Sequence, residues 1–236
     1  MTVSLSDLVH GELHVLGRLV DASNGSLLCR LSDAEAGPLV IYKPRIGERP
    51  LWDFPDGTLS QREVAAYIVA ESLGWQIVPP TVWREGPAGP GMTQLWIEID
   101  ETVDLLALVQ SDHEALRRIA VFDALINNGD RKGGHLLPDA EGRIWGIDHG
   151  VSFAVDDKLR TVLWQWRGEQ IPSRLVADLS DWLRRVGSVE HELAPLRQLL
   201  SVEEVEVLVD RGRRLVADAH HPQPSPDWPA IPWPPF

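Results

Sequence analysis

Cysteine is almost missing from this chain of 236 residues, in which Cys29 is the only one. A single cysteine excludes an internal disulfide, and we expect a protein of a reducing compartment, the cytoplasm. Long apolar runs are missing as well, so no integral membrane association is expected. The N-terminal residues lack a basic stretch followed by an apolar one, so no signal peptide is expected.

Positive charge is scarce: 22 lysines and arginines face 35 aspartates and glutamates, which gives a formal net charge of -13. This balance argues against nucleic-acid binding, and the chain has no polybasic patch for an anionic membrane surface. Apolar residues make up 44% of the chain, as in ordinary globular proteins. The length allows one domain or two small lobes.

The stretch from Phe122 to Phe153 holds the strongest pattern in the chain. Apolar residues at helical spacing predict a helix that stops at Asn127, in the turn Asn-Asn-Gly. Two short apolar segments then flank a Pro-Asp-Ala-Glu-Gly turn, which predicts a hairpin whose second strand ends at Asp148.

A hairpin folds back on itself, so the loop before its first strand lies beside the end of its second strand. We therefore expect Asp130, His135 and Asp148 to meet at one end of this hairpin. Two carboxylates and an imidazole suit a divalent cation, with Mg²⁺ favoured by the oxygens and Mn²⁺ also accepted by the imidazole. The alternative interpretation is a solvated turn followed by a carboxylate that caps the end of a strand.

The residues D-R-x-x-x-H, followed by I-D-H-G, resemble the catalytic and metal-binding loops of the protein-kinase-like superfamily. Within it the chain resembles the phosphatidylinositol 3-/4-kinase-like branch, whose loops read D-R-x-x-x-N and I-D-F-G. More narrowly, it is similar to a small actinobacterial family described as phosphatidylinositol-kinase-related. His135 stands in the place of the family's Asn and His149 in the place of its Phe.

The resemblance implies roles for the loop residues. Asp130 would be the catalytic residue that orients the acceptor hydroxyl, and Arg131 would stabilise the catalytic loop or the transferred phosphoryl group. Asp148 and His135 would hold Mg²⁺, with Mn²⁺ possible and one or two ions left open.

The resemblance also implies an ATP site in the N-terminal half. Lys43 ends an apolar strand and would bind the nucleotide phosphates, held by Glu63 of the next helix. A competing interpretation places Glu63 in a capping box with Ser60. Further cofactor contacts would come from the tip of the first hairpin and from the hinge between the lobes: Ser23, Asn24, Gly25, Gln94, Leu95 and Trp96.

The expected fold is α+β, a two-lobed protein-kinase-like fold with an antiparallel-sheet N-lobe and a mainly helical C-lobe. The N-lobe would cover residues 1–97, the C-lobe 98–219 and a proline-rich, extended tail 220–236. Helical periodicity in the C-lobe predicts three late helices, over 172–185, 189–200 and 202–219.

The segment after the hairpin, residues 155–166, allows two interpretations. In kinases it faces the acceptor, so Lys158 and Arg160 would meet an anionic group while Trp164 and Trp166 form an apolar wall. It would otherwise be a partly buried amphipathic segment.

The function favoured by this sequence is ATP-dependent phosphoryl transfer, a kinase that moves the gamma-phosphoryl group of ATP to a hydroxyl. The acceptor would be a small metabolite, a protein or an inositol lipid. One alternative is a pseudokinase that binds nucleotide and regulates a partner without turnover. A less favoured alternative is a metal-dependent hydrolase using the Asp and His residues of the hairpin. Magnesium-dependent ATP turnover distinguishes these alternatives.

Overall fold

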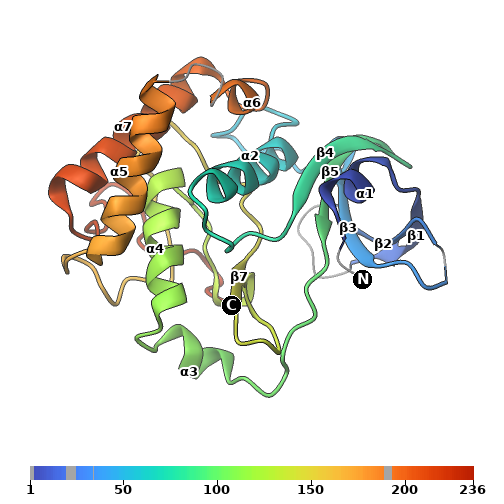
Figure 1. The fold of residues 1–236 in the computed structure, drawn as a ribbon, viewed down its shortest axis with the longest axis horizontal. Helices are drawn as coiled ribbons and strands as arrows, with labels where there is room; N and C mark the ends of the chain where they lie inside the picture. Colours follow the sequence, from blue (N-terminus) through green and yellow to red (C-terminus); the bar gives the residue numbers. More distant parts are fainter. Residues whose placement is uncertain (1–2, 20–24, 34, 189–192) are drawn as a thin grey trace.

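The protein has two lobes, and Figure 1 shows the sheet of the first lobe beside the helices of the second. This computed structural model describes residues 3–19, 25–33, 35–188 and 193–236. The expected α+β arrangement, an antiparallel-sheet N-lobe followed by a mainly helical C-lobe, is confirmed. The residue boundaries expected between the lobes stay a prediction. Among the described residues, no helix is both long enough and apolar enough to cross a membrane.

The N-lobe sheet is antiparallel, with the strand order β1-β2-β3-β5-β4. Successive side chains of a strand point to opposite faces. In β3, Val40 and Tyr42 are buried in the N-lobe core, so Lys43 faces the other side of the sheet. Helix α1 lies against β4 (Figure 1). The bounds are α1 Leu5–His10, β1 Leu13–Arg18, β2 Leu27–Leu31, β3 Leu39–Pro44, β4 Thr81–Gly86 and β5 Gly89–Leu95, with the 3-10 helix η1 over Arg45–Gly47.

Helix α2, Leu59–Ser72, lies between the sheet and the C-lobe. Residues on nearly every side of it are buried, as expected for a helix inside a core rather than on a surface. Ala65, Ala66 and Val69 belong to the same apolar cluster as the C-lobe helices. The position of α2 is therefore determined by both lobes.

The start of α2 differs from the sequence prediction. Ser60 does not cap the helix: the N-cap is Thr58, whose side chain makes no capping bond. The carboxylate of Glu48, in the preceding loop, instead accepts hydrogen bonds from the backbone N–H groups of Leu59 at 2.9 Å and Ser60 at 2.8 Å. Because Glu48 satisfies the helix start, Glu63 is free of a capping role.

The C-lobe is built on α4, which ends at Asn127 in the left-handed conformation, φ 54°, as the turn signal predicted. Helices α5 and α7 confirm the first and third predicted late helices. The second is reduced to the short α6 in the described residues, where Pro195 lies in its first turn. The bounds are α3 Leu105–Val109, α4 Glu114–Ile126, α5 Ser173–Ser188, α6 Ala194–Arg197 and α7 Val202–Asp218.

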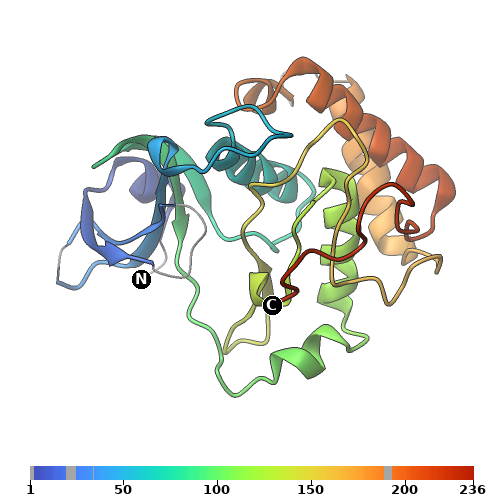
Figure 2. The ribbon, with the colours of Figure 1, turned by 180° about the vertical axis from the view of Figure 1, so that it is seen from behind.

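The predicted hairpin is present as β6, Leu136–Pro138, paired with β7, Ile144–Gly146. A 3-10 helix, η2 over Gly133–His135, leads into it. Residues 220–236 have no helix or strand and cross the C-lobe toward this hairpin, as the red trace in Figure 2 shows.

Candidate active site

A cavity of about 390 Å³ opens between the two lobes, a size suited to a small-molecule ligand. Strands β3 and β5 and the linker after β5 form its N-lobe wall, and the loops around the β6–β7 hairpin form its C-lobe wall. Most of the predicted site residues line it: Lys43, Gln94, Leu95, Trp96, Asp130, His135 and Asp148.

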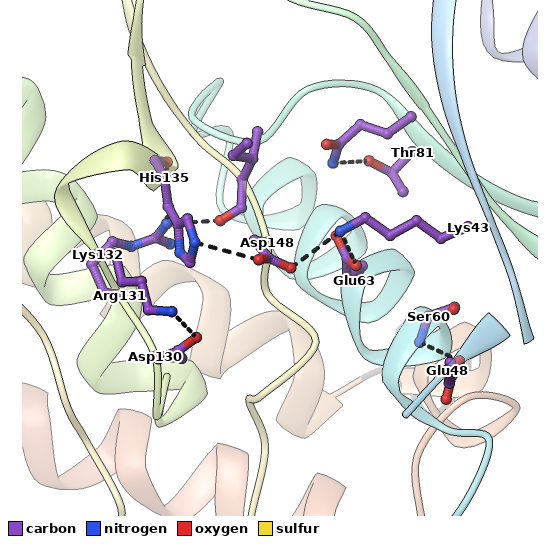
Figure 3. A network of polar contacts seen from close by, with 12 residues as sticks. Lys43, Glu48, Ser60, Glu63, Thr81, Asp130, Arg131, Lys132, His135 and Asp148 are labelled. Atoms are coloured by element: carbon purple, nitrogen blue, oxygen red, sulfur yellow. Dashed lines mark hydrogen bonds and ion pairs between the residues drawn. The ribbon is translucent and has the colours of Figure 1, made fainter. Parts of the chain in front are cut away.

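Lys43 is held between two carboxylates at the inner end of this cavity. Its Nζ lies 2.7 Å from Glu63 Oε1 and 3.1 Å from Asp148 Oδ1 (Figure 3). The predicted pairing of Lys43 with Glu63 is thus present. Burial opposes the charge on Lys43, but the two carboxylates outweigh it and raise the pKa of Lys43. Burial also raises the pKa of Glu63 to about 7.

Asp148 links Lys43 to His135. It follows β7 with a left-handed backbone, φ 58°, and its Oδ2 lies 3.3 Å from His135 Nε2. The Lys43 ammonium holds the pKa of Asp148 well below its usual range. Burial lowers the pKa of His135 to about 4, so the imidazole is neutral at pH 7 and able to accept a metal ion.

The candidate metal ligands Asp148 and His135 fit a divalent ion bound together with a nucleotide. They are too few for a site in which protein side chains supply every ligand. The described residues contain no group of three or more His, Cys, Asp or Glu side chains arranged for a metal. Asp148 and His135 supply one carboxylate and one neutral imidazole on the cavity wall. Mg²⁺ commonly takes one or two protein ligands and completes its shell with substrate phosphates and water.

Asp130 lies on the C-lobe wall of the cavity. Its backbone N–H donates to Asn128 Oδ1 at 2.9 Å, which fixes the turn. Its Oδ2 lies 3.3 Å from Lys132 Nζ. Burial raises the pKa of Asp130, although Lys132 opposes this shift. The carboxylate is thus available to a ligand in the cavity, with one cation beside it.

Arg131 is fully buried, so its side chain does not reach the cavity. Its guanidinium forms a two-point contact with Asp123 of α4, at 2.9 Å for each bond. It also donates to the backbone carbonyl of Ile147 at 2.8 Å and lies 2.7 Å from His149 Nε2. Of its two expected roles, this position supports holding the catalytic loop and is incompatible with contact to a transferred phosphoryl group. His149, packed edge-on against Phe122, belongs to the same buried cluster.

The hinge residues line the cavity, but their polar groups are mostly used by the protein. The Gln94 side chain donates to Thr81 Oγ1 at 2.8 Å. The backbone N–H groups of Leu95 and Trp96 donate to carbonyls of neighbouring segments at 2.9 and 3.0 Å. Backbone donation to a ligand by these two residues is therefore excluded, and Ile97, which also lines the cavity, becomes the better candidate.

The predicted phosphate contacts at the first hairpin tip are only partly described. Ser23 and Asn24 lie outside the described residues. The N–H of Gly25 donates to the Gly47 carbonyl at 2.9 Å, so this donor is not directed to a ligand. Ser26, one residue later, lines the cavity instead.

The segment 155–166 is partly buried, as in the amphipathic interpretation, and its contact with an acceptor stays a prediction. Trp166 is 2% exposed and belongs to the C-lobe core, as in an amphipathic segment. Lys158 is also buried, with its Nζ 3.1 Å from Asp53 and close to three aromatic rings. The indole of Trp164 contacts the C-terminal tail.

Sequence reasoning missed Arg62, which precedes Glu63 on α2. Its side chain is 1% exposed, donates to the Ser152 carbonyl at 2.7 Å and pairs with Glu204 of α7 at 2.5 Å. Ser152 follows the loop that carries Asp148, so Arg62 ties α2 to both that loop and the C-lobe. The capping signal Ser-x-x-Glu at α7 is visible in the sequence, but nothing local pairs Glu204 with Arg62.

No protein-family model matches the chain. The chain is 40% identical over 267 aligned residues to Protein Rv2133c of Mycobacterium tuberculosis, covering 97% of this chain and 94% of the relative. Its fold is similar to the crystal structure of the Helicobacter pylori proinflammatory kinase CtkA, with a TM-score of 0.53, 15% identity, and 90% and 94% of the two chains covered. The chain therefore has a protein-kinase-like fold and belongs to the same family as Protein Rv2133c.

Proposed function

We propose that this protein is an ATP-dependent phosphotransferase that transfers the gamma-phosphoryl group of ATP to a hydroxyl. One observation carries the proposal: Lys43 Nζ lies between Glu63 and Asp148, at the inner end of an interlobe cavity that also contains Asp130. The fold shared with a protein named as a kinase supports it, as does the resemblance of the two loops to phosphatidylinositol 3-/4-kinases.

Phosphoryl transfer depends mainly on positioning and on neutralising charge. Lys43 would neutralise phosphate oxygens, and Glu63 would hold its ammonium in place. Asp130 would orient the acceptor hydroxyl and accept its proton. Mg²⁺ held by Asp148 and His135 would supply further positive charge for the phosphates. Arg131 is a positioning residue here, because it fixes the catalytic loop on α4.

The acceptor is a small metabolite, a protein or an inositol lipid, and the site residues alone favour none of these. The cytoplasm is the proposed compartment, in agreement with the single, buried Cys29.

Calorimetric titration of ATP, with and without Mg²⁺, combined with a phosphate-release assay, tests the proposal. We expect magnesium-dependent binding and slow ATP hydrolysis, since water replaces the missing acceptor. Lys43→Met should weaken ATP binding at least tenfold, because the phosphates lose their buried cation. Arg213→Met removes the same charge from an exposed position on α7 and should leave binding unchanged.

The pseudokinase alternative gains support from Lys132, whose Nζ lies 3.3 Å from Asp130 Oδ2 and would compete with an acceptor hydroxyl for this carboxylate. Magnesium-dependent ATP binding without any turnover would establish this alternative. Failure to bind ATP at all would reject both functions.

A further inference from the structure

The C-terminal tail follows one groove of the C-lobe to the catalytic loop. Seven of the fifteen residues from 222 to 236 are proline, and the red trace in Figure 2 ends beside the β6–β7 hairpin. Upstream, His221 is tied by two backbone hydrogen bonds to residues 168 and 169. Downstream, the backbone N–H of Gly133, in the catalytic loop, donates to the Pro235 carbonyl at 2.8 Å.

The hydrogen bonds along the groove run in one direction. The backbone N–H of Thr161 and the indole Nε1–H of Trp164 both donate to the Ala230 carbonyl, at 3.0 and 2.7 Å. Together with Gly133, the groove offers three donors to tail carbonyls. A proline-rich chain keeps its carbonyls but has few N–H groups of its own, so it matches a surface that presents donors. An indole donor beside an extended chain is a recurring means of binding proline-rich segments.

Side-chain sites complete the groove at both ends. Trp228 stacks on Trp52, with ring centroids 6.3 Å apart, and its ring lies 4.8 Å from Lys158 Nζ. At the other end, the Phe236 ring packs on Gly133, where a Cβ atom would come within 2.0 Å of the ring. A side chain at position 133 would therefore displace the Phe236 ring from this contact.

A hollow lies beside the part of the tail that follows His221. Residues 222–228 border this hollow of about 700 Å³, whose other wall comes from α4, α7 and the segment 156–159.

We propose that the groove formed by Gly133, Thr161 and Trp164, with the Lys158 aromatic site, recognises an extended, proline-rich polypeptide of a partner protein. In this structure the chain's own residues 228–236 fill the groove. A partner segment of the same chemistry binds when it displaces them. The proposal is independent of phosphoryl transfer, because it concerns polypeptide binding alone.

The test uses the full-length protein and a fluorescein-labelled peptide with the sequence of residues 227–236, followed by fluorescence anisotropy. The tethered tail competes at an effective concentration on the order of millimolar, so wild type should bind the peptide weakly. The double variant Trp228→Ala, Phe236→Ala weakens the tethered tail and should bind the peptide at least tenfold more tightly. Trp233→Ala is the matched control, because this tail indole is 85% exposed. The affinity of this variant for the peptide should equal that of wild type.

Two further measurements test the mode of recognition. Adding Trp164→Phe to the double variant removes the indole donor and should lower peptide affinity about fivefold or more, as expected for one lost hydrogen bond. A peptide with alanine in place of every proline should bind more weakly by a similar factor, since it is not preorganised.

If the double variant does not fold by circular dichroism, the single variant Phe236→Gly takes its place, because that ring is already half exposed. The proposal is overturned if a folded variant with a weakened tail binds the peptide no more tightly than wild type. It is also overturned if Trp164→Phe leaves the affinity unchanged.

Discussion

Removal of the Arg62 guanidinium should loosen α2 from the C-lobe and weaken nucleotide binding through Glu63. Arg62 is 1% exposed and connects Ser152 after the metal-binding loop with Glu204 of α7. The next residue on the same helix, Glu63, holds Lys43. Arg62→Met keeps much of the side-chain volume while removing the charge and all donors.

The expected loss of stability comes from the buried groups that lose their partner when the guanidinium is removed. Breaking a buried ion pair by removing one partner costs about 3–5 kcal/mol, since the other charge stays uncompensated. The unpaired Ser152 carbonyl adds about 1–3 kcal/mol, which better packing around the methionine partly offsets. We expect a net loss of about 4 kcal/mol. This loss is smaller than the total stability of about 5–15 kcal/mol that is typical of folded domains, so the variant should stay folded at 25 °C.

A second substitution separates positioning from stability. Glu204 Oε2 also accepts the Ser201 backbone N–H at 2.8 Å, as part of the α7 capping box. Glu204→Gln in the Arg62→Met background keeps this bond, removes the orphaned charge and should recover about half of the lost stability. ATP affinity should stay low in both variants, because neither restores the tie between α2 and the metal-binding loop.

The measurements are urea denaturation and calorimetric ATP titration on wild type and both variants. A loss below about 1 kcal/mol in Arg62→Met would refute the anchoring role. Recovery of ATP affinity together with stability would show that Arg62 acts on the fold alone and does not position Glu63.

Three more outcomes are expected. Asp130→Asn should lower turnover at least tenfold and change ATP affinity only a few fold, because general-base assistance contributes about a hundred- to ten-thousandfold in rate. Single-turnover phosphoryl transfer and calorimetric ATP titration measure the two effects. Unchanged turnover would contradict the catalytic role of Asp130. Asp148→Ala should abolish magnesium-dependent ATP binding while thermal melting stays near that of wild type, and retained magnesium dependence would reject the metal assignment. Burial lowers the pKa of His221 from 6.5 to about 4, so the unfolded chain binds a proton at this residue more readily than the folded protein does. The stability that the neutral imidazole contributes is therefore lost as pH falls from about 6.5 toward 4. Between pH 7 and pH 5 the free energy of unfolding, measured by urea denaturation, should fall by about 2 kcal/mol through this residue. The free energy of unfolding of His221→Gln should depend less on pH. An equal dependence in both proteins would count against the role of His221.

The sequence by itself determined the local elements and which residues they carry. The helix ending at Asn127, the β6–β7 hairpin and the apolar strand before Lys43 follow from periodicity and turn chemistry, which act over a few neighbouring residues. Once the hairpin forms, chain connectivity brings His135 and Asp148 together.

Only the tertiary structure decided which partners these residues have. Glu63 pairs with Lys43 because Glu48, from a loop eleven residues earlier, already satisfies the start of α2. Arg131 is buried because Asp123, an acid on an otherwise apolar helix face, lies beneath it.

The longest contacts show why the sequence could not decide more. Arg62 and Glu204 are 142 positions apart, and the tail reaches Gly133 from about a hundred residues away. Such contacts form when whole elements pack, and packing depends on shape and burial that no short pattern encodes. The loop from Asp130 to His135 could thus be predicted from the sequence, whereas the contacts that hold α2 and the tail near it could not.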